Sequence, residues 1–140
     1  MRFLIPFLLA SPVSAWEFLP VPICTLTHME PDVEVVLTFD QSIPEYTLTI
    51  TRVDLWPDAD VFAMTFIGTR GLTISTDRHT LSDDGKSLTV VDSGFGNVLN
   101  GLQFGETAVA FSRGLEVDID LTDAAPAVAA FRDCPAPATS

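Results

Sequence analysis

The stretch Tyr46-Thr47-Leu48-Thr49-Ile50-Thr51-Arg52 decides the fold class, because apolar and polar side chains alternate along it without a break. Successive side chains of a β-strand point to opposite faces, so Tyr46, Leu48 and Ile50 would face a core while the threonines face solvent. β-Branched and aromatic residues also favour strands. We therefore predict a half-buried strand over residues 46–52.

The same period-two pattern recurs before and after this strand. It predicts further strands over residues 24–28, 33–39, 61–67, 72–76, 107–111 and 115–121. Two more segments, residues 79–82 and 86–91, flank Asp83-Asp84-Gly85. Because Asp-Gly supplies the positive φ angles of tight turns, these segments predict a hairpin. The chain is thus expected to be mainly β.

Two segments have helical spacing instead. Residues 96–102 predict a short helix with Asn100-Gly101 as its C-terminal cap. Residues 123–134 predict a C-terminal helix capped by Thr122 or Asp123, with Cys134 on its apolar face. The expected architecture is an antiparallel β-sandwich or curled sheet with one short helix and a C-terminal helix.

The first 15 residues are typical of a cleavable export signal. Arg2 supplies positive charge, residues 3–10 are largely apolar, and Val13-Ser14-Ala15 supplies small residues for cleavage. The apolar run is shorter than the roughly 20 residues that span a bilayer, and no later stretch is longer. We expect residues 1–15 to be removed, a single β-rich domain over residues 16–134, a disordered tail over residues 135–140, and a periplasmic or secreted location without a membrane span.

The two cysteines, Cys24 and Cys134, lie near opposite ends of the predicted domain. An even pair in an exported chain predicts a disulfide bond. Zinc binding would need closely spaced ligands, and a redox role would favour a Cys-x-x-Cys motif. The sequence has neither pattern. The bond would close a loop of roughly 110 residues, for which the chain-entropy model gives about 5 kcal/mol.

The charge balance excludes several functions. The formal net charge is −12, and Lys86 is the only lysine, so binding to the phosphates of nucleic acid is not expected. The chain has neither a glycine-rich phosphate loop nor a Gly-x-Ser-x-Gly motif. Ser93, between Asp92 and Gly94, has no identifiable triad partners. We therefore predict no cofactor, no metal and no catalytic residue.

The candidate polar site comprises His28, Asp77, Arg78 and His79, which include both histidines of the chain. Asp77 and His79 would share one face of a strand, as acid–base partners or as two ligands of a metal ion that His28 could complete. The alternative is a turn in which Asp77 bonds to local backbone and Arg78 pairs with an acid. Two ligands make an incomplete metal site, which favours the turn.

The two tryptophans lie in proline-containing, irregular stretches. Trp16 and Trp56 would most simply fill the core at an edge of the sheet. Alternatively, Trp16 and Trp56 would form a contact patch for a partner, with Trp56 exposed beside Asp58 and Asp60.

Several short segments carry a resemblance that extends over most of the chain. They are residues 16–18, 23–28, 76–79, 94–99 with 101–102, and 127–134. In these the chain resembles short exported proteins of unknown function from alphaproteobacteria, some of which are named as excinucleases. The helix that ends in a cysteine is also weakly similar to the invasion-associated locus B family. The resemblance implies no catalytic residues, and the export signal and acidity argue against DNA repair.

These observations together predict an exported β-domain without catalytic activity that binds a protein or a small ligand in the cell envelope. Two alternatives remain open. One is a metal-dependent or acid–base enzyme that uses Asp77, His79 and His28, and the other is a purely structural component of the envelope.

Overall fold

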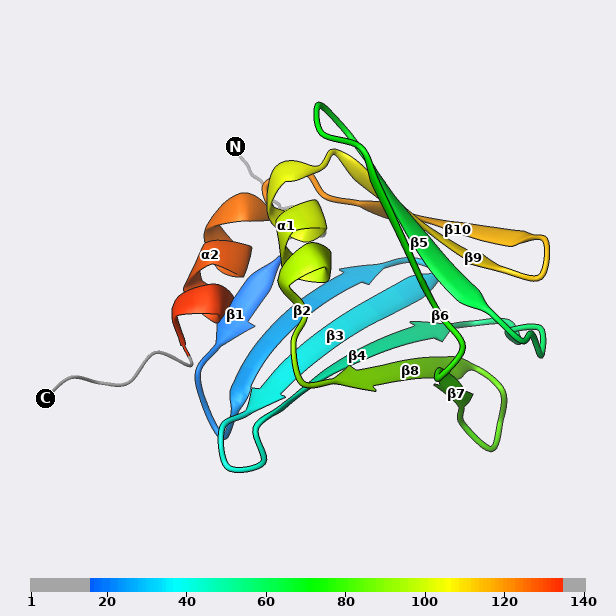
Figure 1. Ribbon diagram of the computed structural model, residues 1–140, viewed down its shortest axis with the longest axis horizontal. Coiled ribbons are helices and arrows are strands. Elements are labelled where there is room, and N and C mark those ends of the chain that lie inside the picture. The colour runs from blue at the N-terminus through cyan, green and yellow to red at the C-terminus, as the bar shows by residue number, and fades with distance from the viewer. Residues whose placement is uncertain (1–15, 135–140) are drawn as a thin grey trace, which may run out of the picture.

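The computed structural model describes residues 16–134, which form two antiparallel sheets and two helices (Figure 1). The large sheet has the strand order β1-β2-β3-β4-β8-β7, and the small sheet has the order β10-β9-β5-β6. The predicted export signal and tail lie outside the described residues. The prediction of a mainly β, two-layer antiparallel fold is confirmed. The strands are β1 (Glu17–Leu19), β2 (Cys24–Glu30), β3 (Val33–Asp40), β4 (Glu45–Arg52), β5 (Phe62–Ile67), β6 (Leu72–Thr76), β7 (Thr80–Leu81), β8 (Ser87–Asp92), β9 (Thr107–Ser112) and β10 (Leu115–Asp120).

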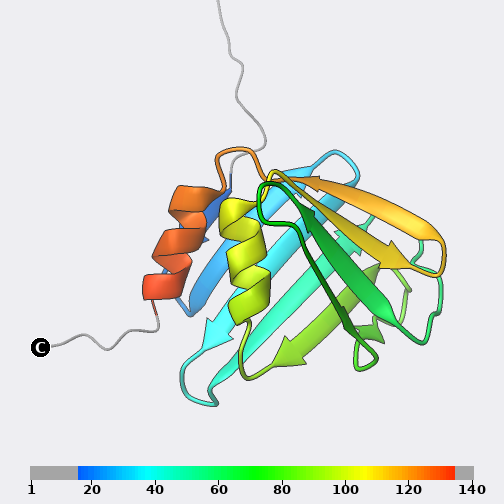
Figure 2. The same ribbon diagram turned by 45° about the horizontal axis from the view of Figure 1, so that its top comes forward.

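Both helices stand over the same face of the large sheet as the small sheet does. Helix α2 (Ala125–Asp133) packs against β1 and β2, and helix α1 (Gly96–Phe104) lies between α2 and the small sheet (Figure 2). The helices and the small sheet thereby cover one apolar face together. Within residues 16–134, no helix is long and apolar enough to cross a membrane.

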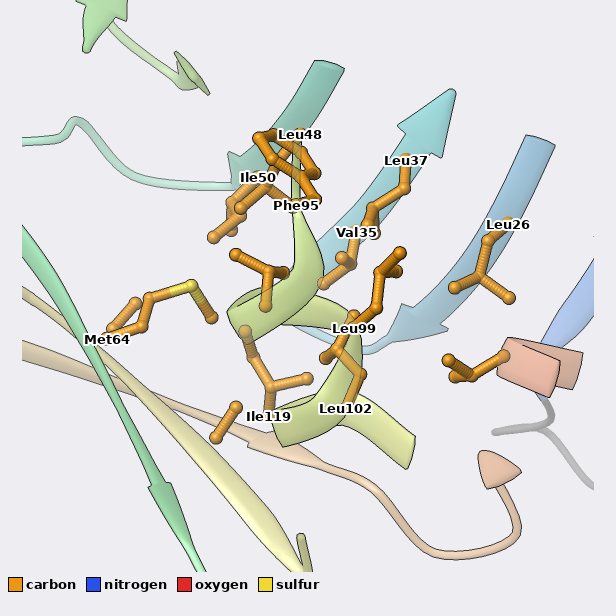
Figure 3. Packing of buried hydrophobic residues seen from close by; sticks show 14 of the residues in the cluster. Leu26, Val35, Leu37, Leu48, Ile50, Met64, Phe95, Leu99, Leu102 and Ile119 are labelled. Atoms are coloured by element: carbon orange, nitrogen blue, oxygen red, sulfur yellow. The ribbon is translucent and has the colours of Figure 1, made fainter. Parts of the chain in front are cut away.

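The inward face of the large sheet is built from rows of side chains that cross the strands. One row runs through Leu26, Leu37, Leu48 and Val90, which are paired across β2, β3, β4 and β8. The three leucines are almost fully buried, and burial of such a side chain contributes roughly 1.5–3 kcal/mol. Figure 3 shows part of this row facing the inner side of the small sheet, with side chains of α1 in the space between.

Gly101 fixes the position of α1, and it does not end the helix as predicted. A Cβ atom at Gly101 would lie only 2.3–2.6 Å from three ring atoms of Phe66 on β5. The glycine therefore allows the helix to approach the small sheet closely. The helix continues to Phe104, and the amide of Gly105 donates to the Gly101 carbonyl at 2.9 Å.

One other local expectation is wrong, and one strand was not predicted. Helix α2 follows Ala124, and neither Thr122 nor Asp123 caps it, because the hydroxyl and the amide of Thr122 both donate to Asp120. The sequence pattern also missed β1, which is too short to show an alternation and depends on pairing with β2.

Candidate functional site

A groove of about 620 Å³ opens between the two sheets. Its lining comes from β8 of the large sheet, from β5 and β6 of the small sheet, and from the first turn of α1. Figure 1 labels these elements. This volume falls within the range of about 300–1,000 Å³ that small-molecule sites have. The apolar part of the lining includes Leu48, Phe62, Met64, Ile74, Val90 and Val98.

The groove exists because both sheets end there. β6 is the last strand of the small sheet, so Ile74, which pairs with Met64 on β5, has no strand on its other side and stays half-buried. β7 pairs only with Leu88 and Thr89 of β8, which leaves residues 90–92 uncovered on that side. Ile74 and Val90, which pack against the core, therefore stay partly exposed between these two edges.

The rim of the groove carries one charge of each sign. Arg78 follows β6, and Asp92 ends β8. The backbone amide of Arg78 donates to Thr76 Oγ1 at 3.0 Å, which holds the chain in a tight turn, while Asp92 Oδ1 accepts the amide of Ser93 at 2.6 Å. Both side chains are exposed, and no ion pair joins them within 4 Å. The groove thus combines an apolar floor with separated polar groups.

The polar cluster predicted from sequence is split by the fold. Asp77 and Arg78 are exposed in the connection from β6 to β7, whereas the His79 ring is half-buried, 6.0 Å from the ring of Phe62. Within residues 16–134, Asp77 makes no side-chain hydrogen bond to His79 and Arg78 forms no ion pair with an acid. The expected pairing of Arg78 with an acid is therefore wrong, because this exposed residue has no carboxylate of the described chain within 4 Å.

His28 is buried in a separate network at the other end of the large sheet. Its ring stacks on Trp16 with a centroid separation of 4.4 Å, and Nε2 lies 2.7 Å from Glu30 Oε2. The same carboxylate oxygen accepts the amide of Asp120 at 2.7 Å, and Trp16 Nε1 donates to the Asp120 carbonyl at 3.0 Å. These contacts join the start of the described chain to β2 and β10.

The fold does not bring His28 to Asp77 and His79. His28 on β2 and Leu81 on β7 are separated by four strand spacings, or roughly 19 Å along the sheet. Among the described residues, no three His, Cys, Asp or Glu side chains lie close enough together to hold a metal ion. The three-residue metal site considered from sequence is therefore not assembled, because β3, β4 and β8 separate its members.

The prediction that Trp16 and Trp56 fill the core is confirmed, and the alternative of a contact patch is wrong. Trp16 and Trp56 are 6% and 3% exposed, so neither presents a surface to a partner. Trp56 Nε1 donates to the Ile50 carbonyl at 3.1 Å, and its ring meets that of Phe62 edge-on. Each indole finds a carbonyl for its only donor, which allows these large rings to be buried as core.

The predicted disulfide bond between Cys24 and Cys134 is present, with a Cα–Cα distance of 6.2 Å. Cys24 begins β2, and Cys134 follows the last turn of α2. On α2, Val128 and Phe131 are fully buried, as the predicted inward face requires. The bond thus ties the C-terminal helix to the first long strand.

Two further hollows lie elsewhere on the surface. One of about 200 Å³ adjoins Leu72 and Phe104, where the Arg70 guanidinium lies 5.3 Å from the Phe104 ring centroid. The other, of about 350 Å³, is lined by acids on loops and β10 together with Arg52. The first is smaller than the roughly 300–1,000 Å³ of small-molecule sites, and the second is lined largely by acids.

Three carboxyl groups have shifted pKa values, and local turns explain all of them. The Ser42 hydroxyl and amide lower the pKa of Asp40, and those of Thr122 do the same for Asp120. The Ser82 hydroxyl, together with the Lys86 amide, lowers the pKa of Asp84. None of these acids lines the groove, so the shifts belong to turns rather than to a catalytic site.

No family model matches the chain, and no curated protein or solved structure shows significant similarity to it.

The groove was not found from the sequence, because its apolar lining has the same alternation as any core. The sequence analysis did single out Arg78, but it grouped this residue with His28, which lies at the other end of the large sheet.

Proposed function

We propose that this protein is an exported, non-catalytic binding domain, and that the groove between β6 and β8 holds a small molecule with an apolar body. The observation that carries the proposal is the groove itself. It leaves Ile74 and Val90 half-buried and Val91 42% exposed in a concave site of suitable volume, with buried core residues such as Met64 behind them. The acid–base alternative is less well supported, because Asp77 and His79 make no contact that would position or polarise either group.

Two observations support export. The Cys24–Cys134 disulfide is of a kind that persists in oxidising compartments such as the periplasm. Trp16, the first residue after the predicted cleavage site, is already buried and hydrogen-bonded, which fits a chain processed at Ala15. Mass spectrometry of protein recovered from the envelope fraction should give the mass of residues 16–140 less two hydrogens. An unprocessed or reduced mass in that fraction would contradict the proposal.

The binding proposal is tested with a neutral fluorescent probe, N-phenyl-1-naphthylamine. We expect saturable binding to the wild-type protein and a loss of affinity of about tenfold or more in Asn97→Trp. Asn97 is exposed on the first turn of α1 and lines the groove, so the larger ring fills the site without disturbing the core. Thr73→Trp, on the outer face of β6, is the matched control and should bind like the wild type. Equal binding by both variants, or no saturable binding at all, would refute this site.

The bare edge of β6 favours a second candidate, a protein partner that adds a strand. Exposed edges are usually protected by charge, proline or shortness. β1 and β7 are short, and β10 carries three acids, whereas β6 reads Leu-Thr-Ile-Ser-Thr and has no such protection. A photo-crosslinking residue at Ser75 should then capture an extended segment of one partner in cells, and the same residue at Glu116 should not. Equal capture at both positions would exclude strand addition.

A further inference from the structure

We infer that the ligand of the groove carries an anionic group, such as a carboxylate, and that Arg78 binds it. This inference rests on the proposed function, and it specifies the chemical class of the ligand. The starting observation is that the Arg78 side chain lies at the rim of the groove and has no hydrogen-bond or ion-pair partner among the described residues.

Arg78 differs in this respect from the other arginines of residues 16–134. Arg52 donates to the Leu55 carbonyl, Arg113 donates to the Asp58 carbonyl at 3.0 Å, and Arg132 donates to Asn100 at 2.8 Å. Arg70 lies over an aromatic ring. Each of these side chains thus stabilises a local contact, whereas Arg78 has no such structural role.

The lack of a partner is informative because the protein is rich in acids. The sequence has 19 Asp and Glu residues and only 7 Lys and Arg residues. Asp77 is adjacent in the chain and Asp92 lines the same groove, yet neither forms an ion pair with Arg78. A guanidinium carries five N–H donors in a planar fork that matches a carboxylate. Those donors remain available to a ligand.

The floor of the groove makes such a contact stronger than it would be in water. Ile74 and Val90 are the partly exposed apolar side chains of the lining, and an apolar body packed on them would displace water. Charge-assisted hydrogen bonds are stronger at a site of lower local dielectric. The ligand is therefore an amphiphile with its anionic group at Arg78 and its apolar body along the floor.

Asp92 determines the polarity of this arrangement. Its carboxylate lies on the β8 side of the groove, so an anion placed there would be repelled. The rim therefore favours a ligand with one anionic end, oriented towards the connection that follows β6. Neutralising Asp92 should strengthen the binding of an anion, and neutralising Arg78 should weaken it.

The test compares two probes of the same shape, 2-naphthoate and 2-naphthylmethanol, by fluorescence titration at pH 7. We expect the wild-type protein to bind the carboxylate about tenfold or more tightly than the alcohol, as a charged hydrogen bond requires. In Arg78→Gln this preference should fall to about twofold or less, with the affinity for the alcohol unchanged. Asp92→Asn should raise the affinity for the carboxylate a few-fold. Arg70→Gln, a second exposed arginine that lies outside the groove, is the matched control and should keep the wild-type preference.

Equal affinities for the two probes in the wild type, or a preference that survives Arg78→Gln, would overturn the inference and leave the groove as a site for neutral molecules. Absence of saturable binding by either naphthalene probe, together with no binding of N-phenyl-1-naphthylamine, would overturn the proposed function as well.

Discussion

Removal of the Cys24–Cys134 disulfide should destabilise the protein strongly, because this bond closes almost the whole described chain. The sequence separation is 110 residues, for which the chain-entropy model gives about 5 kcal/mol as an upper figure. At about 2.1 cal/mol/K of unfolding entropy per residue, this corresponds to a fall in Tm of roughly 20 °C. The suitable variant is the double substitution Cys24→Ala and Cys134→Ala, which leaves no free thiol and buries no hydroxyl at the buried Cys24.

The native fold should survive this change. Helix α2 stays attached through Val128 and Phe131, both fully buried, each worth roughly 1.5–3 kcal/mol of apolar burial. The loss should therefore come from a less restricted unfolded state. Circular dichroism at 20 °C should be unchanged, while urea unfolding should show a lower midpoint and a larger m-value, since the unfolded chain exposes more surface.

The control is the wild-type protein with a reducing agent, whose Tm should fall to that of the double variant, while the variant itself should not respond. A Tm difference below about 5 °C would refute the loop-entropy reasoning. Loss of the native circular dichroism at 20 °C would contradict the expectation that the packing of α2 keeps the fold intact without the bond.

Three further predictions concern packing, pH and the start of the described chain. Gly101→Ala should destabilise the protein by about 1–3 kcal/mol through overlap with Phe66, as measured by urea titration. This cost exceeds the roughly 1 kcal/mol that alanine contributes to helix propensity. The control is Gly94→Ala, whose Cβ meets no atom within 4 Å and which should be nearly neutral in the same titration. Hydrogen bonds from Thr122 hold the pKa of Asp120 below 3.8; the stabilisation is therefore present above the unfolded-state pKa near 4 and is lost as the pH falls through the lower folded-state value. Asp120→Asn should accordingly reduce Tm more at pH 7 than at pH 2, and an equal effect at both pH values would show that ionisation is irrelevant. Trp16→Phe keeps the stack on His28 but loses the hydrogen bond to the Asp120 carbonyl. The free energy of unfolding should therefore fall by about 1 kcal/mol. An unchanged free energy of unfolding would mean that this hydrogen bond adds no net stability.

Most of the secondary structure could be predicted from the sequence, because it depends on side-chain periodicity along short segments. The alternation over residues 46–52 reappears as β4, and that over residues 115–121 as β10. The Asp84-Gly85 turn appears between β7 and β8, with Gly85 at a positive φ of 74°. The same periodicity identifies which face of each strand is buried, so the fold class follows from local information.

Local errors arose where a contact distant in sequence decides the conformation. Gly101 has the local signature of a helix end, yet it lies inside α1 because Phe66 of β5 needs its space. β1 is too short to show a pattern and forms through pairing with β2. The burial of Trp16 and Trp56, by contrast, was predicted correctly, and carbonyl groups on other segments accept their N–H groups.

The sequence by itself determined the antiparallel β class, the disulfide partners and the absence of any recognisable catalytic motif, since these depend on composition and on spacing along the chain. Only the tertiary structure decided which polar residues are neighbours. It separates His28 from His79 by the width of three strands and places Arg78 above an apolar groove. The physical reason is that packing of the whole chain, rather than any one segment, sets the order of strands in a sheet. A groove then forms where the edges of two sheets do not meet.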